Sequence, residues 1–261
     1  MGHLGSTNDG RGPRTNEANE GARSRNTSPT SERPLDEIAG GLRVKVLESL
    51  RRQGFLLDTA GSITPVAGMQ KVALRDLHKE ARAAAIERAR PGLVRHEERL
   101  LRYFAHGGEV DPRKITPVLR EVMPGTEEEL LFRYARLHWS IPVSAGYGRR
   151  LRFLVFDEHN GKLIGLFGLG DPVFSLGPRD DWIGWDQQTK RERLRYVADA
   201  FVLGAVPPYS RLLCGKLIAL LATSDEVRTA FARKYAGRPS MITGRVLDCS
   251  LALITTTSAL G

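Results

Sequence analysis

The chain has 261 residues, of which 41% are hydrophobic and 26% charged, and its 39 Lys and Arg against 30 Asp and Glu give a net charge of +9. This composition excludes a collagen, a coiled coil and a disulfide-stapled miniprotein. No apolar run reaches the roughly 18 residues that a membrane span requires, and the polar N-terminus carries no secretory signal. The two cysteines, Cys214 and Cys249, have no partner spacing, so we expect a reduced, cytoplasmic protein without membrane contact.

Three parts are predicted along the chain. Residues 1–34 consist of Gly, Asn, Ser, Thr, Arg and Glu with almost no apolar side chains. Such a segment cannot bury enough surface to offset the entropy of ordering it. We therefore predict a disordered tail over 1–34, a helical region over 35–138 and a mixed α/β domain over 139–261.

The helical region is predicted from apolar periodicity and from helix start and stop signals. Its predicted helices cover 35–53, 68–90, 93–105, a stretch that opens at Asp111-Pro112, and 127–138. Pro91-Gly92 is expected to end the second helix. Asp111-Pro112 would supply an N-cap and a proline at the first helical position. Thr126 precedes three glutamates, and acidic residues favour the positive end of a helix.

In the second half of the chain the sequence pattern changes, and it predicts both strands and helices. Its predicted elements are strands at 151–156, 162–169, 200–206 and 251–257, and helices at 210–223 and 225–235. Asn160-Gly161 is a strong hairpin signal between the first two strands, and the glycines of 162–169 suggest close approach by another backbone. Residues 251–257 are apolar on both faces, as in a buried strand. The predicted fold class is α+β, a helical N-terminal region followed by a mixed α/β domain.

A basic stripe lies on the predicted helix 68–90. Lys71, Arg75, His78 and Arg82 follow one another at spacings of four, three and four residues, which places them on one helix face. Such a stripe can follow the phosphates of DNA or RNA. The alternative is a solvated outer face that nearby glutamates partly balance, since no aromatic residues are interleaved with the basic ones.

The segment from Arg179 to Asp186 is a candidate catalytic site because it combines two tryptophans, adjacent acids and an arginine. Asp180 or Asp181 could act as a general base, and Arg179 could hold a carboxylate or phosphate. The alternative is a loop pinned by buried tryptophan rings and a local Arg–Asp pair.

A second candidate site follows the strand that ends near Val206. Pro207-Pro208 leads into a helix that carries Arg211, Gly215 and Lys216, and a strand–loop–helix junction can bind an anion such as acyl-CoA or a nucleotide. The phosphate-loop motif itself fails, because ten residues separate Gly204 from Gly215-Lys216. The alternative is a proline-stiffened turn.

Other motifs are absent or incomplete. Gly165, Gly168 and Gly170 imitate a nucleotide-binding pattern, but Asp171-Pro172 follows in place of a helix start. The six histidines have no ligand spacing with each other or with cysteine, so no metal site is predicted.

Several long motifs together resemble one known family. They comprise Trp139-Ser140-Ile141-Pro142, residues 146–155 (GYGRRLRFLV), Arg179-Asp180 with 182–185 (WIGW), 204–209 (GAVPPY) before Gly215-Lys216-Leu217, and 255–261 (TTTSALG). Over roughly residues 37–261 the chain is similar to the DruA family of bacterial Druantia anti-phage systems. The resemblance implies a role in anti-phage defence beside other proteins of the system, and it supplies no catalytic residues. Members of the family continue past the Thr-rich strand, so we expect this chain to be truncated at its C-terminus.

Three functions are consistent with the sequence. The first is a defence component whose basic helical region binds nucleic acid or partner proteins. The second is a transferase-like enzyme with an anionic cofactor, because the layout of the α/β half is similar to that of acyl-CoA-dependent N-acetyltransferases. The third is a scaffold without activity. The second reading expects the Trp-bearing segment and the double-proline corner to lie together over one end of the sheet.

Overall fold

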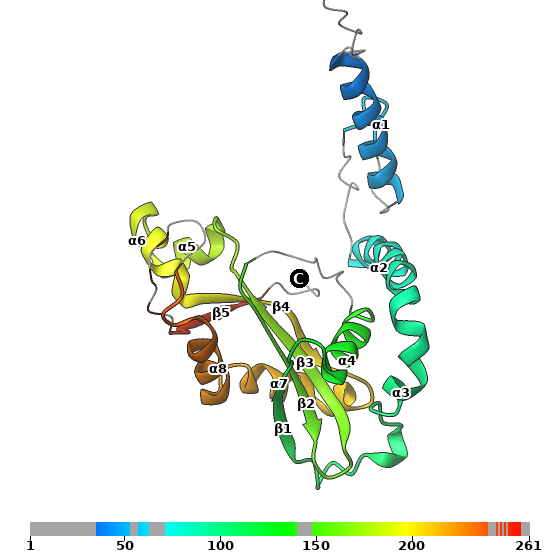
Figure 1. The fold of residues 1–261 in the computed structure, drawn as a ribbon, viewed down its shortest axis with the longest axis vertical. Helices are drawn as coiled ribbons and strands as arrows, with labels where there is room; N and C mark the ends of the chain where they lie inside the picture. The colour runs from blue at the N-terminus through cyan, green and yellow to red at the C-terminus, as the bar shows by residue number, and fades with distance from the viewer. Residues whose placement is uncertain are drawn as a thin grey trace, which may run out of the picture. The chain divides into compact units, whose positions relative to one another are not determined.

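The structure, a computed structural model, describes residues 35–52, 57–62, 71–139, 148–239 and 250–256, together with Gly244, Val246 and Asp248. The tail predicted over 1–34 lies outside these residues. Figure 1 shows helices and a mixed sheet, which confirms the α+β class. None of the described helices is both long and apolar enough to cross a bilayer.

The centre of the fold is a five-stranded sheet with the order β1-β2-β3-β4-β5. The strands are β1 (Pro117–Glu121), β2 (Arg150–Asp157), β3 (Lys162–Gly170), β4 (Val197–Ala205) and β5 (Leu253–Thr255). The first four pair antiparallel, and β5 pairs parallel with β4. The predicted hairpin is confirmed, and the amide of Gly161 donates to the carbonyl of Asp157 at 2.8 Å.

The helices are α1 (Leu35–Arg52), α2 (Lys71–Leu93), α3 (Glu97–Leu101), α4 (Glu127–Arg136), α5 (Gly177–Ile183), α6 (Gln187–Arg193), α7 (Cys214–Leu221) and α8 (Asp225–Tyr235). The start of α4 agrees with the sequence, because Thr126 Oγ1 accepts the amide of Glu129 at 3.3 Å.

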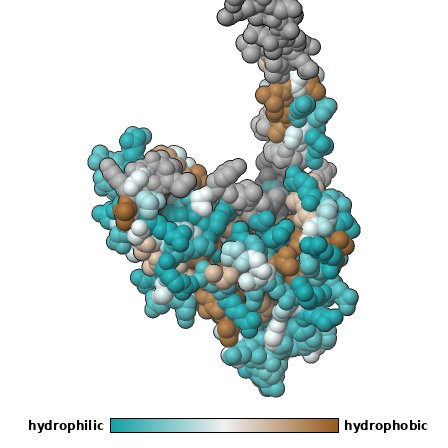
Figure 2. All heavy atoms as spheres, viewed as in Figure 1, coloured by the Kyte–Doolittle hydropathy of each residue, from teal (hydrophilic) through white to brown (hydrophobic). Residues whose placement is uncertain are grey.

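Apolar side chains cover both faces of the sheet, since residues alternate along each strand. Leu154, Leu166 and Val202 pack with Phe132 of α4, and we call this side the α4 face. Phe153 and Phe167 stack at 4.9 Å on the opposite side, which α7 and α8 cover and which we call the α7 face. The sheet is therefore the middle of three layers (Figure 1). On the outer surface visible in Figure 2, hydrophilic residues dominate.

One predicted helix is replaced by a turn, and the predicted end of another helix is wrong. The helix expected at Asp111-Pro112 is a turn, in which Asp111 accepts the amides of Arg113 and Lys114, at 3.1 Å through its carboxylate and 2.9 Å through its carbonyl. This turn leads into β1, so the region predicted as helical contributes an edge strand. Pro91 does not end α2 either, which continues to Leu93. A proline removes only one helical hydrogen bond at such a late position, and the extra turn buries Leu93.

The last strand also differs from expectation. Residues 253–255 form an edge strand whose side chains are only half-buried, whereas the sequence predicted a strand buried on both faces. This strand pairs in parallel with β4, and the apolar side chain of Leu251 is buried just before the strand begins.

Candidate functional site

The basic stripe lies within one continuous helix, α2, of 23 residues. Of its four residues, the structure describes the side chains of His78 and Arg82, and both are half-buried. Helical spacing continues the same face to Ile86 and then to Leu93, which is buried. His78 and Arg82 are therefore on the side of α2 that is partly covered towards its C-terminal end, whereas Lys79 is exposed.

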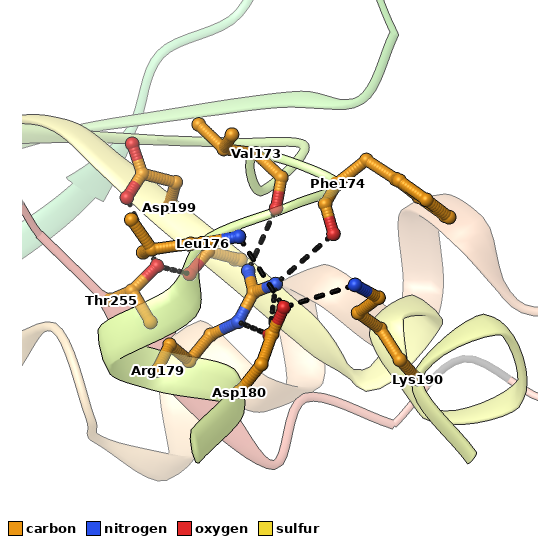
Figure 3. A network of polar contacts seen from close by, with 9 residues as sticks. Val173, Phe174, Leu176, Arg179, Asp180, Lys190, Asp199 and Thr255 are labelled. Atoms are coloured by element: carbon orange, nitrogen blue, oxygen red, sulfur yellow. Dashed lines mark hydrogen bonds and ion pairs between the residues drawn. The ribbon is translucent and has the colours of Figure 1, made fainter. Parts of the chain in front are cut away.

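The candidate catalytic segment folds into α5 and is held by a buried ionic network (Figure 3). The guanidinium of Arg179 donates to Asp180 Oδ1 from Nε at 2.8 Å and from a terminal nitrogen at 2.6 Å. It also donates to the carbonyls of Val173 and Phe174 at 2.8 and 3.3 Å. Lys190 of α6 binds the other oxygen of Asp180 at 3.1 Å.

This network leaves little capacity for chemistry at Arg179 and Asp180. Only 4% of the Arg179 side chain is exposed, and its donors point at protein acceptors, so it is poorly placed to hold a substrate anion. Burial alone would raise the pKa of Asp180, but the hydrogen bonds from Arg179, Lys190 and the amide of Leu176 lower it below its ordinary value. A carboxylate with a lowered pKa is a weak general base. The arrangement resembles the local Arg–Asp pair that the sequence left open.

The remaining residues of that segment are more exposed than the sequence suggested. Asp181 is exposed, and Trp182 is 83% exposed, so the expected docking of both tryptophan rings is wrong for Trp182. Trp185 is half-buried, with the Arg179 guanidinium 5.9 Å from its ring.

A second acid lies beside this network on β4. Asp199 is half-buried, and Thr255 Oγ1 of β5 donates to it at 3.0 Å. Burial raises the pKa of Asp199, while Thr255 and the positive charges of Arg179 and Arg150 oppose the rise. The sequence analysis did not identify Asp199, because a single acid within an apolar strand gives no pattern.

The double-proline corner is fixed by a buried polar cluster that the sequence analysis also missed. The hydroxyl of Tyr209 donates to Asp157 Oδ2 at 2.9 Å and accepts from Asn160 Nδ2 at 2.9 Å. Asp157 is fully buried and also accepts the amides of Thr116 and His159, at 3.0 and 3.2 Å. The sequence signal for this cluster was the tyrosine directly after Pro207-Pro208.

The candidate cofactor residues lie at the start of α7. Arg211 and Lys216 are exposed, and a Cβ at Gly215 would meet nothing within 4 Å. Leu213 enters the helix in a left-handed conformation with φ of 60°. Cys214 is buried, and burial raises the pKa of its thiol.

The two candidate sites do not meet. In the antiparallel pair of β3 and β4, Gly170 lies opposite Asp199 and Gly165 lies opposite Ala205. The Arg179–Asp180 network follows Gly170, whereas Arg211 and Lys216 follow Ala205, so they lie at opposite ends of these strands. Six residues of strand separate these ends by about 20 Å. The expectation of one shared concave site is therefore wrong.

No group of three or more His, Cys, Asp or Glu side chains within the described part of the chain could hold a metal ion.

Comparisons with known proteins give one consistent result. A family model described as "Druantia protein DruA" matches residues 68–261. A curated protein of Escherichia coli (strain UMEA 4076-1), also named "Druantia protein DruA", is 46% identical over 220 residues. The match covers 84% of this chain and 54% of that protein, so the chain spans about half the length of its relative. No solved structure matches, and the likeness to N-acetyltransferases stays a prediction.

Proposed function

The chain belongs to the DruA family of Druantia proteins, and from this premise we propose that it acts in a bacterial anti-phage defence system by binding nucleic acid through its basic helical region. The defence role is taken from the family resemblance. The nucleic-acid role rests on charge and helix geometry.

The observation that carries the proposal is the uninterrupted helix α2. Because it has no break, Lys71, Arg75, His78 and Arg82 share one face, which extends over about 16 Å at 1.5 Å per residue. Residues 71–102 contain nine Lys and Arg against five Asp and Glu. The half-buried stem of Arg82 can still present its charged end to phosphates.

The test is the salt dependence of binding to duplex DNA, single-stranded DNA and RNA. The variant Lys71→Gln/Arg75→Gln/Arg82→Gln removes three charges from the stripe. The control Lys79→Gln/Arg88→Gln/Arg90→Gln removes three charges from other faces of the same helix. Each lost phosphate contact should lower the slope of log K against log salt by about 0.9, so we expect a loss of about 2–3 for the stripe variant and little change for the control. Equal effects of both variants, or no binding at low salt, would contradict the proposal.

A transferase-like activity is the second candidate, favoured by the exposed cations Arg211 and Lys216 beside the open approach to Gly215. Arg211 precedes α7 and Lys216 lies in its first turn, and this helix belongs to the connection between the parallel strands β4 and β5. Acyl-CoA or a nucleotide would bind there, and Asp180 or Asp181 would have to act from the far end of the strands. A thermal-shift screen with acyl-CoA and nucleotides tests this candidate, and a stabilisation that Lys216→Gln removes would support it.

Contact with other proteins of the defence system is the third candidate. Val173, Phe174 and Trp182 are exposed apolar side chains around α5, and such groups are common at protein interfaces. If Trp182→Ala weakens co-purification with the other defence proteins while nucleic-acid binding is unchanged, this role gains support.

A further inference from the structure

Two arginines of β2 point toward the α4 face of the sheet. Arg152 donates to Glu129 of α4 at 3.3 Å, and its guanidinium lies 5.9 Å from the ring of Phe132. Arg150 is two residues earlier and so shares this face, where its guanidinium lies 4.3 Å from the ring of Phe201. Arg136 lies four residues after Phe132 in α4, so it shares the helix face that carries this ring.

The positive charge of these three residues is poorly compensated. Glu129 pairs with Arg152, but neither Arg136 nor Arg150 forms an ion pair with any residue that the structure describes. The segment 140–147, which joins α4 to β2, contains no acidic residue.

The acids nearest Arg150 are already engaged. Asp171 is paired with Arg149, and Asp199 accepts the hydroxyl of Thr255.

The environment of Arg150 is preorganised. Phe201 occupies the extra position in β4 where the register with β3 shifts, and its ring lies over Gly168, where a Cβ would come within 2.3 Å of it. Stacking covers one flat side of the Arg150 guanidinium and leaves the edge N–H groups available for a bidentate acceptor. Its Nε is buried and has no hydrogen-bond partner within the described part of the chain.

The pKa values of Arg136 and Arg150 also indicate that positive charge is concentrated on this face. Burial lowers the pKa of Arg136, and the charges of Arg152, Arg133 and Arg150 lower it further. Burial and the charge of Arg152 also lower the pKa of Arg150, and the opposing effects of Asp171, Tyr235 and Asp199 only partly offset this fall. The folded chain therefore holds these guanidinium groups together against their repulsion, which a bound anion would relieve.

We propose that Arg136, Arg150 and Arg152 form a binding site for a phosphate group on the α4 face of the sheet. Three arginines and Glu129 leave two positive charges, which suits a phosphate dianion or two adjacent phosphodiesters, and planar guanidinium groups match phosphate oxygens. The site is formed by residues of α4 and β2, not by the stripe on α2, and it goes beyond the function proposed above. Its ligand is a phosphate from a nucleic-acid backbone or from a free phosphate compound.

The experiment measures the binding of pyrophosphate and of a short single-stranded oligonucleotide to the whole chain, by calorimetry and thermal shift at ionic strength matched with chloride. The variants are Arg136→Gln and Arg150→Gln. The control is Arg113→Gln, an exposed arginine in the turn before β1. We expect wild-type protein and control to bind pyrophosphate, and each site variant to lose at least tenfold in affinity.

A stability readout separates binding from a structural role. Without phosphate, Arg136→Gln and Arg150→Gln should leave Tm unchanged or raise it, because each removes repulsion. A lower Tm together with an intact pyrophosphate shift would overturn the proposal. Arg150→Lys keeps the charge, so it should fold as wild type does. It should bind pyrophosphate more weakly than wild type, because a lysine ammonium lacks the planar pair of donors that a guanidinium offers.

The source of the phosphate is decided by competition. Displacement of pyrophosphate by the oligonucleotide supports a backbone ligand, whereas binding of pyrophosphate without displacement supports a free phosphate compound. The absence of binding by both would refute the site. The stripe variant on α2 should bind pyrophosphate like wild type, so the site and the proposed function can fail independently.

Discussion

Replacing Tyr209 with phenylalanine tests whether the buried polar cluster stabilises the corner between β4 and α7. The substitution keeps the ring and removes only the hydroxyl, which donates to Asp157 Oδ2 at 2.9 Å and accepts from Asn160 at 2.9 Å. Tyr209 and Asp157 are both fully buried, so water cannot replace the lost donor without a rearrangement.

The expected loss follows from the charge of the acceptor. A hydrogen bond to a charged group contributes about 1.5–3 kcal/mol, and an unsatisfied buried acceptor is costly. Asp157 keeps two amide donors, those of Thr116 and His159, so we expect Tyr209→Phe to lower the free energy of unfolding by about 2–3 kcal/mol. For a domain of this size that corresponds to a fall in Tm of roughly 5–10 °C.

Urea unfolding measured at two pH values also tests the direction in which the stability difference between wild type and Tyr209→Phe changes with pH. Burial, with a further contribution from Asp157, raises the pKa of Tyr209 to about 12, above the value of about 10 in the unfolded chain. A raised pKa in the folded state means that the stabilisation is complete below pH 10 and is lost as the pH rises toward 12. The difference between wild type and Tyr209→Phe should therefore be larger at pH 8 than at pH 11.

Tyr196→Phe is the matched control, because Tyr196 is only half-buried and its hydroxyl accepts from its half-buried neighbour Arg195 at 2.8 Å. We expect this control to cost less than about 1 kcal/mol. A Tyr209→Phe variant that unfolds at the same urea concentration as wild type, or a difference that grows with pH, would refute the reasoning.

Three further substitutions test other parts of the structure. Asp180→Asn should lower Tm at pH 7, and the difference in Tm from wild type should become smaller below about pH 4. The reason is that the pKa of Asp180 is lowered in the folded protein, so its stabilising contribution is complete above the ordinary aspartate pKa and is lost as the pH falls below it. A Tm equal to wild type would contradict the buried pair with Lys190. Gly168→Ala should cost about 1–3 kcal/mol in urea unfolding through overpacking against Phe201, and a neutral result would show that the ring moves freely. Trp182→Ala should change stability by less than about 0.5 kcal/mol because the ring is 83% exposed, and a large loss of Tm would show that the ring is docked.

Local chemistry determined much of this fold. The Thr126 cap, the Asn160-Gly161 turn and the apolar strands on either side of that turn were identified from residues within a few positions of each other. The glycines of β3 were expected to admit a neighbouring backbone, and a Cβ at Gly165 would indeed lie 2.4 Å from the carbonyl oxygen of Gly204. The Asp111-Pro112 error has a local cause too, since an Asp-Pro pair opens a turn as readily as a helix.

The sequence by itself determined the class of the fold, most of its elements and the family, and it offered the adjacent Arg179–Asp180 pair as one of two readings, because each is encoded in consecutive or helically spaced residues. Tertiary structure alone decided that the two candidate sites lie at opposite ends of β3 and β4, that Tyr209 meets Asp157, and that Arg152 of β2 meets Glu129 of α4. Those contacts depend on strand register and on the packing of layers, which bring together side chains from distant parts of the chain. A pattern of neighbouring residues cannot encode them.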